Sequence, residues 1–295
     1  MLIGVTGAHG FLGSHLWAGL RKRAYDVKVF DKRSHSLSDI ASMKDFVEDV
    51  DVIFHLAGLT SSSSIQVSNE ELITVNALGT FHLLEAIRRY SKNDVRLIFA
   101  STLHVYGVTD TLRYLNESEI PMPKTTYGLS KLLGEEMISC YGTQYGIKGL
   151  IFRFANIYGP GCKPYQYSVI ATYMDLIRRN KPVQVIGNGV RDFIYVSDVV
   201  CALSESLKHS FTSDCVFNVC TGVPVTAREV IEALTSISGI TPTVEYRNTK
   251  EPADYLVGDP RKFLENIRRM SFTDLRTGLI TTVEQLRRDR ATSAT

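Results

Sequence analysis

The chain has 295 residues and a formal net charge of +2, so its charge gives no reason to expect a nucleic-acid partner. This length fits one large α/β unit or two small domains. The five cysteines form no C-x-x-C pair and the histidines show no ligand spacing, which favours reduced thiols in the cytoplasm over a disulfide framework or a metal site. Because Met1 leads directly into an expected strand and no apolar run is long enough to span a bilayer, we expect neither a secretion signal nor a membrane anchor.

The first segment, residues 2–13, combines a short apolar run with a glycine-rich turn that holds Gly7, Gly10 and Gly13, and a helical pattern follows it. This order predicts a strand, a tight turn and a helix, which is the context in which glycines bind a dinucleotide. Gly7 permits the sharp turn, Gly10 lets a pyrophosphate approach the helix N-terminus, and Gly13 allows close packing of helix and strand. The free N–H groups and the positive end of the helix dipole then face the phosphates.

A second expected strand, residues 27–31, ends in Asp31, about where a carboxylate that binds the cofactor ribose belongs. Such a carboxylate accepts a hydrogen bond from the 2′-hydroxyl and repels a 2′-phosphate, which favours NAD over NADP. The alternative is a simple turn aspartate. Lys32 and Arg33 follow at once and are suited to a phosphate, so NADP stays open.

Strand and helix patterns alternate up to about residue 159, which predicts an α/β fold with a doubly wound parallel sheet of the Rossmann type. The expected strands are nearly continuous apolar runs, as is typical of parallel strands that are covered on both faces. In this part we expect strands at residues 51–57, 96–100 and 149–154 and helices at 76–90 and 127–141.

The regular alternation of strand and helix patterns ends at about Gly159. We expect a helix at residues 168–179, a strand at 182–186, and a tail with two helices and a short strand near 243–246. The chain therefore predicts a cofactor domain of residues 1–159 and about 183–220, and a smaller C-terminal lobe of about 160–182 and 221–295 that binds substrate. The cleft between them is a natural place for a ligand.

Tyr127 and Lys131 are four residues apart in an expected helix, so they share one face of it. A phenol with its ordinary pKa of about 10 is a poor base at pH 7, but a nearby ammonium and a positively charged nicotinamide lower that pKa. Thr102 follows the strand at residues 96–100, at the sheet edge where open α/β folds bind ligands. Together these side chains predict a general acid–base that exchanges a proton with an alcohol. The Y-x-x-x-K pattern alone is common in helices, and a capping hydroxyl is the alternative for Thr102.

These segments belong to a series of motifs that resembles the extended short-chain dehydrogenase/reductase family, specifically its nucleotide-sugar epimerase/dehydratase branch. The resemblance covers nearly the whole chain. In chain order the motifs are Gly7-Ala8-x-Gly10-x-x-Gly13, Ser38-Asp39-Ile40, His55-Leu56-Ala57-Gly58, Asn76-x-x-Gly79-Thr80, Ser101-Thr102-x-x-Val105-Tyr106-Gly107, Tyr127-x-x-x-Lys131, Arg153-Phe154-x-Asn156-x-Tyr158-Gly159-Pro160, and Gly187-x-Gly-x-Arg191-Asp192-Phe193-x-Tyr195-Val196-x-Asp198.

The resemblance implies a role for each site residue. The cofactor-binding positions that it implies are Gly7, Gly10, Phe11, Leu12, Gly13, Asp31, Lys32, Asp39, Ile40, Leu56, Ala57, Gly58, Asn76, Ser101, Tyr127, Lys131 and Phe154. Within that set, Asp39 is expected at the adenine amino group, and Ala57 and Gly58 near the ribose. The implied catalytic residues are Thr102, Tyr127 and Lys131, and the implied substrate-binding residues are Thr102, Tyr127, Asn156 and Arg191.

The implied role of Arg191 is to pair with the diphosphate of a nucleotide sugar, which suits its planar fork of donors. Read locally, Arg191 is an ordinary surface arginine and Asn156 a residue of a loop turn.

The two residues that directly follow the catalytic threonine help to distinguish between the reactions of this branch. Dehydratases of the branch carry an Asp-Glu pair there, and the related decarboxylases carry the glutamate, whereas this chain has Leu103 and His104. The cysteine that fucose-type synthases use in this segment is also missing. The resemblance therefore favours an NAD-dependent 4-epimerase, which oxidises the sugar transiently at position 4 with no net redox change.

The alternative is an NAD(P)H-dependent 4-reductase of nucleotide-4-keto-6-deoxysugars, which runs only the second half of that reaction. A third hypothesis, from another class, is a non-catalytic cofactor-binding sensor, and the intact Thr102, Tyr127 and Lys131 argue against it.

Some features depart from the family pattern. The turn at residues 187–191 is short, and Glu251 stands near the position of an arginine that grips the second phosphate, with Lys250 as a point charge beside it. The base and the sugar therefore stay open. The resemblance further implies a homodimer through the helices at 76–90 and 127–141. The local alternative is that the outer faces of these helices are solvated.

Overall fold

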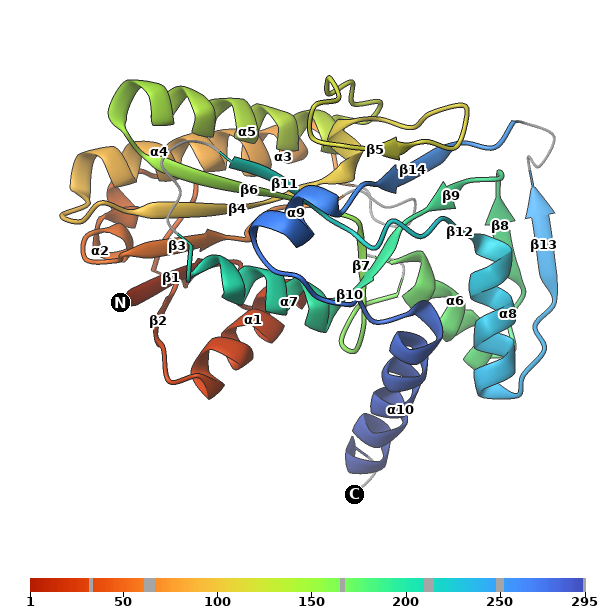
Figure 1. Cartoon of the computed structure of the whole chain (residues 1–295). Helices are drawn as coiled ribbons and strands as arrows, with labels where there is room; N and C mark the ends of the chain where they lie inside the picture. The colour runs from red at the N-terminus through yellow and green to blue at the C-terminus, as the bar shows by residue number, and fades with distance from the viewer. Residues whose placement is uncertain (32–33, 61–66, 165–167, 210–214, 248–251, 294–295) are drawn as a thin grey trace.

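The computed structural model describes residues 1–31, 34–60, 67–164, 168–209, 215–247 and 252–293 (Figure 1). Its larger part is a six-stranded sheet with the order β11-β6-β4-β3-β1-β2, in which every pairing is parallel. Its strands are β1 (Leu2–Thr6), β2 (Asp26–Val29), β3 (Val52–His55), β4 (Arg96–Thr102), β6 (Lys148–Phe154) and β11 (Cys215–Val219). The sheet confirms the expected doubly wound α/β architecture.

The winding of the sheet changes direction at β1. The chain passes from β1 to β2 on one side and then returns to β3, β4 and β6 on the other. At the carboxyl ends of β1 and β3, Thr6 lies opposite His55 and its hydroxyl is 2.7 Å from the imidazole Nδ1. A crevice at such a switch point is where open α/β sheets bind ligands.

Helices cover both faces of the sheet (Figure 1). One face packs against α1 (Phe11–Lys22) and α7 (Val196–Ser206), with Leu16, Leu20, Val199 and Leu203 in its core. The other face packs against α2 (Lys44–Val47), α4 (Gly79–Tyr90) and α5 (Thr126–Tyr145), with Phe46, Leu83 and Ile138 in its core. The short helix α9 (Arg261–Asn266) lies against β11.

Shorter strands and three helices form a smaller group beside the sheet. The strand pairs and small sheet of this group are β7–β10, β8–β13 and β12-β9-β14-β5. The elements are β5 (Tyr114–Leu115), β7 (Asn156–Tyr158), α6 (Val169–Arg178), β8 (Val183–Ile186), β9 (Val190–Arg191), β10 (Phe193–Tyr195), β12 (Val225–Thr226), α8 (Ala227–Ser238), β13 (Val244–Arg247), β14 (Tyr255–Gly258) and α10 (Leu275–Ser293). Residues of α6, α8, α10 and the strands β7, β8, β10, β12 and β13 share an apolar core of their own, whereas Leu115 of β5 and Leu256 of β14 pack in the core of the large sheet.

The structure differs from the sequence-based expectation at three places. The helix expected at 76–90 begins as α4 at Gly79. It follows α3 (Asn69–Leu72) and a π-helical turn at Ile73–Leu78, and the Ser68–Glu71 capping box fixes the start of α3. The tail holds three described helices, α8, α9 and α10, instead of two. The strand at residues 183–186, which is expected in the cofactor domain, pairs with β13, which is expected in the C-terminal lobe.

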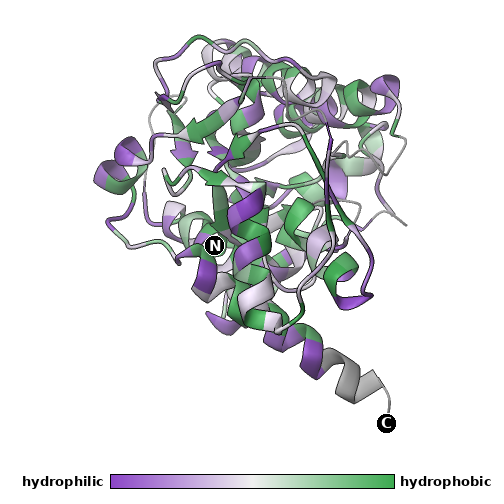
Figure 2. Cartoon of the chain, turned by 90° about the vertical axis from the view of Figure 1, so that its right-hand side faces the viewer, coloured by the Kyte–Doolittle hydropathy of each residue, from purple (hydrophilic) through white to green (hydrophobic). Residues whose placement is uncertain are grey.

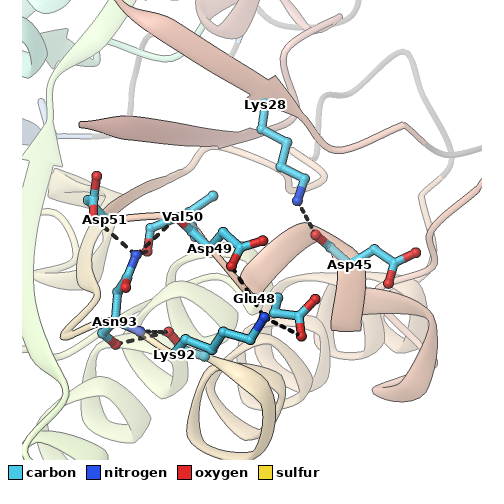
Figure 3. A network of polar contacts seen from close by, with 9 residues as sticks. Lys28, Asp45, Glu48, Asp49, Val50, Asp51, Lys92 and Asn93 are labelled. Carbon is cyan, nitrogen blue, oxygen red and sulfur yellow. Dashed lines mark hydrogen bonds and ion pairs between the residues drawn. The ribbon is translucent and has the colours of Figure 1, made fainter.

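Polar contacts tie the loops at the amino ends of β3 and β4 (Figure 3). The side chain of Asn93 donates to the carbonyl of Asp49 at 3.0 Å and to the carboxylate of Asp51 at 3.1 Å, and Lys92 pairs with Glu48 at 3.0 Å. Lys28 donates to the carbonyl of Asp45 in the same region. These contacts stabilise the end of the sheet at which β3 and β4 begin, opposite to the carboxyl ends of the strands.

Hydrophobic residues gather in the strands at the middle of the molecule, and α10 extends away from the body toward the C-terminus (Figure 2). Within the described ranges, no helix combines the length and apolar character that a bilayer crossing needs.

Candidate active site

The turn between β1 and α1 leaves no room for a side chain at Gly7 or Gly13. Gly7 has a φ of +71°, and an added Cβ there would lie 2.7 Å from the backbone nitrogen of Ala57. Gly10 donates its N–H to the Gly7 carbonyl at 2.9 Å, and a Cβ on Gly13 would lie 2.0 Å from that same oxygen. Helix α1 therefore starts directly behind β1, and Phe11 and Leu12 of its first turn are partly exposed. Its first N–H groups lie at the sheet edge where a pyrophosphate fits.

The two acidic residues expected at the cofactor follow β2. The carbonyl of Asp31 accepts the backbone N–H of His35 at 2.8 Å, and its side chain is partly exposed. Asp39 is exposed and its carboxylate accepts the backbone N–H of Ala41 at 3.0 Å, while Ile40 is partly exposed. Lys32 lies outside the described residues.

The segment Leu56–Gly58 follows β3 and completes this edge. The N–H of Ala57 donates to the hydroxyl of Thr6 at 3.1 Å, which joins the ends of β1 and β3. Asn76 is buried below the segment. Its side chain accepts the N–H of Leu59 at 2.7 Å and donates to the hydroxyl of Ser130 at 2.9 Å. Asn76 thus links the expected cofactor segment to α5.

We expect Gly58→Ala to weaken NAD binding about tenfold, which corresponds to about 1.4 kcal/mol. The new Cβ would lie 3.0 Å from Asn76 Oδ1 and 3.3 Å from Lys131 Nζ, so both side chains must shift. Titration of the purified protein with NAD, followed calorimetrically, measures the effect.

Gly19→Ala is the matched control for that change. Its Cβ would lie 3.1 Å from a methyl group of Val200, which is equally tight but lies away from the glycine turn. Unchanged NAD affinity in Gly58→Ala would contradict the placement of Gly58 at the cofactor.

Thr102, Tyr127 and Lys131 meet at the carboxyl edge of the sheet. Thr102 ends β4, and α5 begins beside it, with the Thr125 hydroxyl accepting the N–H of Gly128 at 3.1 Å as the N-cap. The Thr102 side chain lies close enough to Tyr127 to lower its pKa. One turn along α5, the ammonium of Lys131 lies 4.7 Å from the centre of the Phe99 ring.

Burial has the largest effect on the pKa values of Tyr127 and Lys131. It raises the pKa of Tyr127 to about 12, and the nearby Thr102 side chain opposes the rise. Burial also lowers the pKa of Lys131 to about 8, against the opposing charge of Glu135. The expectation that its neighbours lower the Tyr127 pKa is therefore not met by the protein groups alone, because loss of water around the phenol outweighs them.

Glu135 lies one further turn along α5, and the sequence analysis missed it. Its carboxylate forms a buried ion pair with Arg153 on β6, with the shortest contact 2.6 Å, and also accepts the Ser101 hydroxyl. Ser101, expected at the cofactor, is thus held in an internal network, and Phe154 is buried in the core. The spacing of four residues from Lys131 was the signal that could have identified Glu135.

Asn156 and Arg191 lie on the side of the smaller group. The amide of Asn156 donates to the carbonyl of Asp192 at 3.0 Å. Both terminal nitrogens of Arg191 engage the carboxylate of Asp254, at 2.9 and 3.1 Å. His104 also belongs here, because its ring centre is 6.0 Å from that of Tyr127. The sequence analysis gave neither His104 nor Asp254 a role in the site.

A cavity of about 320 Å³ lies elsewhere, between α6, α8 and α10. Its walls are mostly apolar and include Met174, Leu234 and Val283, whereas Thr102, Tyr127 and Lys131 do not line it. The chemistry-bearing side chains, and not this cavity, mark the candidate active site.

Known proteins that are similar to this chain identify its family. Residues 3–220 match the model of the NAD dependent epimerase/dehydratase family. The UDP-glucose 4-epimerase of Thermus thermophilus, solved in complex with NAD, is 29% identical with a TM-score of 0.83, and 97% of this chain and 99% of that one are covered. The UDP-glucose 4-epimerase of Thermotoga maritima, solved with UDP-glucose, is 29% identical with a TM-score of 0.86, and 98% of this chain and 100% of that one are covered.

A reductase is equally similar in sequence. The GDP-6-deoxy-D-mannose reductase of Pseudomonas aeruginosa is 30% identical, with 84% of this chain and 83% of the reductase covered. Epimerases and a reductase are thus similar to this chain to about the same degree. The chain belongs to the NAD-dependent epimerase/dehydratase family of extended short-chain dehydrogenases/reductases, and it is an enzyme of the nucleotide-sugar class.

Proposed function

We propose that the chain is an NAD-dependent nucleotide-sugar 4-epimerase. The observation that carries the proposal is the placement of Thr102 and the buried Lys131 beside Tyr127, with Leu103 and His104 in place of the acidic residues that elimination or decarboxylation would use. The glycine turn supports a bound dinucleotide, because side chains at Gly7 or Gly13 would fill its place. Asp31 at the end of β2 favours NAD over NADP.

In this proposal, Tyr127 removes the proton of the sugar 4-hydroxyl and later returns it. Thr102 holds the same oxygen, and Lys131 stabilises the phenolate and binds the nicotinamide ribose. NAD, when bound, supplies a hydride acceptor and donor together with a positive charge beside the phenol. Bringing a phenol with a pKa of about 12 to one near 7 requires about 7 kcal/mol, so the ammonium and that charge must act together in a dehydrated site.

We further propose that the six-stranded sheet and its helices form the cofactor domain, and that the smaller group binds the nucleotide sugar. The strand at residues 183–186 then belongs to the smaller group, because it pairs with β13. Arg191 faces the diphosphate and Asp254 orients it through the two-point contact. Asn156 faces the sugar.

The second candidate is a 4-reductase of nucleotide-4-keto-6-deoxysugars. The identity with the GDP-6-deoxy-D-mannose reductase favours it, and the same trio serves both reactions. The two differ in redox balance, since an epimerase regenerates its cofactor within each turnover whereas a reductase consumes one reduced cofactor.

A panel of UDP-, dTDP-, GDP- and CDP-sugars separates these candidates. We expect interconversion of 4-epimers, identified by chromatography, without net change in the absorbance of reduced nicotinamide. Stoichiometric oxidation of NADH or NADPH with 4-keto sugars only would instead establish the reductase.

We propose that the enzyme is a homodimer in the cytoplasm. Leu78, Leu129 and Tyr145, at or near the helices expected to pair, are large apolar side chains that the single chain leaves exposed. Tyr141 is buried and donates its hydroxyl to Glu85 at 2.7 Å, so it serves the core. None of the five cysteines, all of which lie within the described residues, forms a disulfide, which supports a reducing compartment. Light scattering at micromolar concentration should give about twice the 32.9 kDa chain mass, and a monomer alone would refute the dimer.

A further inference from the structure

Asp192 is a fully buried residue between β9 and β10, directly after Arg191. Its carboxylate accepts hydrogen bonds from the turn that follows β11. One oxygen accepts the backbone N–H of Thr221 at 3.0 Å and the hydroxyl of the same residue at 2.6 Å, and the other oxygen accepts the N–H of Gly222 at 2.8 Å. Because β11 belongs to the large sheet, Asp192 joins that sheet to the smaller group.

The backbone of the same residue holds Asn156. The carbonyl of Asp192 accepts both the backbone N–H and the side-chain amide of Asn156, each at 3.0 Å. The N–H of Asp192 donates in turn to the carbonyl of Leu256 on β14 at 3.2 Å. Asn156 is therefore oriented at two points by a residue that is itself fixed on several sides.

The turn after β11 also leads to Arg191. Beyond Gly222 the chain enters β12, and Val225 of β12 lies opposite Arg191 of β9. Arg191 thus has Asp192 as its neighbour along the chain and β12 as its neighbour across the small sheet. Because the carboxylate of Asp192 fixes the turn that leads into β12, it acts on the backbone of Arg191 along both routes.

A carboxylate is the side chain that this arrangement requires. Its two oxygens only accept hydrogen bonds, and here two N–H groups and a hydroxyl donate to them. An asparagine has nearly the same size, but it places an NH₂ group where one oxygen stands, so that a buried donor would face another donor. Buried polar groups that lose their partners in this way are costly, and the turn would have to move to satisfy them.

We propose that Asp192 is a positioning residue for substrate binding, which holds Asn156 and Arg191 in their places relative to the large sheet. The proposal rests on the nucleotide-sugar function proposed above, in which these two side chains face the sugar and the diphosphate. Side chains that bind a ligand keep their geometry when neighbouring hydrogen bonds lock them. The affinity for the nucleotide sugar therefore depends on Asp192, whereas the affinity for NAD, which binds at the glycine turn after β1, does not.

The test measures the binding of NAD and of nucleotide sugars separately, by calorimetric titration of the folded proteins. UDP-glucose, dTDP-glucose, GDP-mannose and CDP-glucose are first titrated into the NAD-loaded wild-type protein, and the tightest of the four is the probe for the variants. For Asp192→Asn we expect the probe to bind at least about tenfold more weakly, as when buried groups lose their hydrogen bonds. NAD should bind within about twofold of the wild type.

Asp198→Asn is the matched control. Asp198 is also buried, and its carboxylate accepts the backbone N–H and the hydroxyl of Thr273 at 2.8 and 3.1 Å, but it ties α7 to the segment before α10. We expect this variant to lose stability to urea as Asp192→Asn does, while the probe and NAD bind within about twofold of the wild type. A purely structural role of Asp192 predicts instead that the two variants behave alike in every measurement.

A milder pair of variants gives the answer if Asp192→Asn does not fold. Thr221→Val removes the hydroxyl that donates to Asp192 and keeps the shape of the side chain, and Thr273→Val does the same to Asp198. We expect the probe to bind about threefold more weakly to Thr221→Val, the effect of one ordinary hydrogen bond, and as in the wild type to Thr273→Val.

The inference is overturned if the probe binds Asp192→Asn within about twofold of the wild type, or if the probe and NAD weaken by the same factor. If Asp192→Asn does not fold, equal probe binding by Thr221→Val and Thr273→Val overturns it. Any of these results together with turnover in the nucleotide-sugar panel overturns this inference alone. A wild-type protein that binds none of the four nucleotide sugars overturns it as well, and absence of all turnover in the panel then overturns the proposed function too.

Discussion

Tyr127→Phe is expected to lower kcat by about a hundredfold to ten-thousandfold, since positioned acid–base groups contribute about 10² to 10⁴ in rate. The change removes only the hydroxyl that exchanges the proton and its interaction with Thr102. The ring remains to pack against His104, so the fold and NAD binding should survive. The measurement is kcat with the best substrate of the panel, together with the NAD retained after gel filtration.

The pH dependence offers a second readout of Tyr127. Because only the phenolate accepts a proton and burial raises the pKa of this phenol, the wild-type rate should rise with pH through the phenol's pKa in the complex. The residual rate of Tyr127→Phe should lack that rise. Tyr145→Phe, at the exposed end of the same helix, is the control and should keep its rate. A Tyr127→Phe variant with more than a tenth of wild-type turnover would remove Tyr127 from the proposed chemistry, and a biological output that persists in it would favour the sensor hypothesis.

The parts of the site that the sequence predicted are those fixed by local geometry. A helix places Tyr127 and Lys131 on one face whatever the rest of the fold does, and a strand that ends in Thr102 brings its hydroxyl to the sheet edge. The glycine turn follows from steric limits on three neighbouring positions. Such arguments need no knowledge of partners far along the chain.

The remaining features depend on contacts between distant segments. Arg191 contacts Asp254, which is 63 positions away in the sequence, and β8 pairs with β13 at a similar separation. The local sequence of these segments does not indicate which distant segment each one contacts. The raised pKa of Tyr127 in the protein alone has a related origin. The neighbouring charges can be read from the sequence, but the burial that outweighs them is a property of the assembled fold.

Glu135→Gln is expected to destabilise the protein by about 3–5 kcal/mol and to shift its activity to lower pH. The carboxylate binds Arg153 with both partners almost fully buried, so its loss leaves the guanidinium without a counter-charge in a site that excludes water. Urea unfolding measures the loss. Glu136→Gln, one residue further and exposed, is the matched control and should stay within about 0.5 kcal/mol of the wild type.

The pH shift has a separate cause. Burial lowers the pKa of Lys131 to about 8, and the charge of Glu135 opposes it, so removing that charge lowers the pKa further. A lysine loses its positive charge as pH rises through its pKa. In Glu135→Gln the ammonium that stabilises the Tyr127 phenolate is therefore lost at a lower pH, and the alkaline fall of kcat moves down with it.

The double variant Glu135→Gln/Arg153→Met separates the two effects. It removes both buried charges, so no unpaired ion remains, and its stability should recover toward that of the wild type. The fall of its kcat at alkaline pH should nevertheless stay shifted to lower pH, because Lys131 still lacks the neighbouring carboxylate. If stability and pH profile recover together, Glu135 acts on the site only by holding Arg153. If the shift persists in a stable protein, Glu135 sets the charge of Lys131, and the buried pair below the trio is part of the catalytic apparatus.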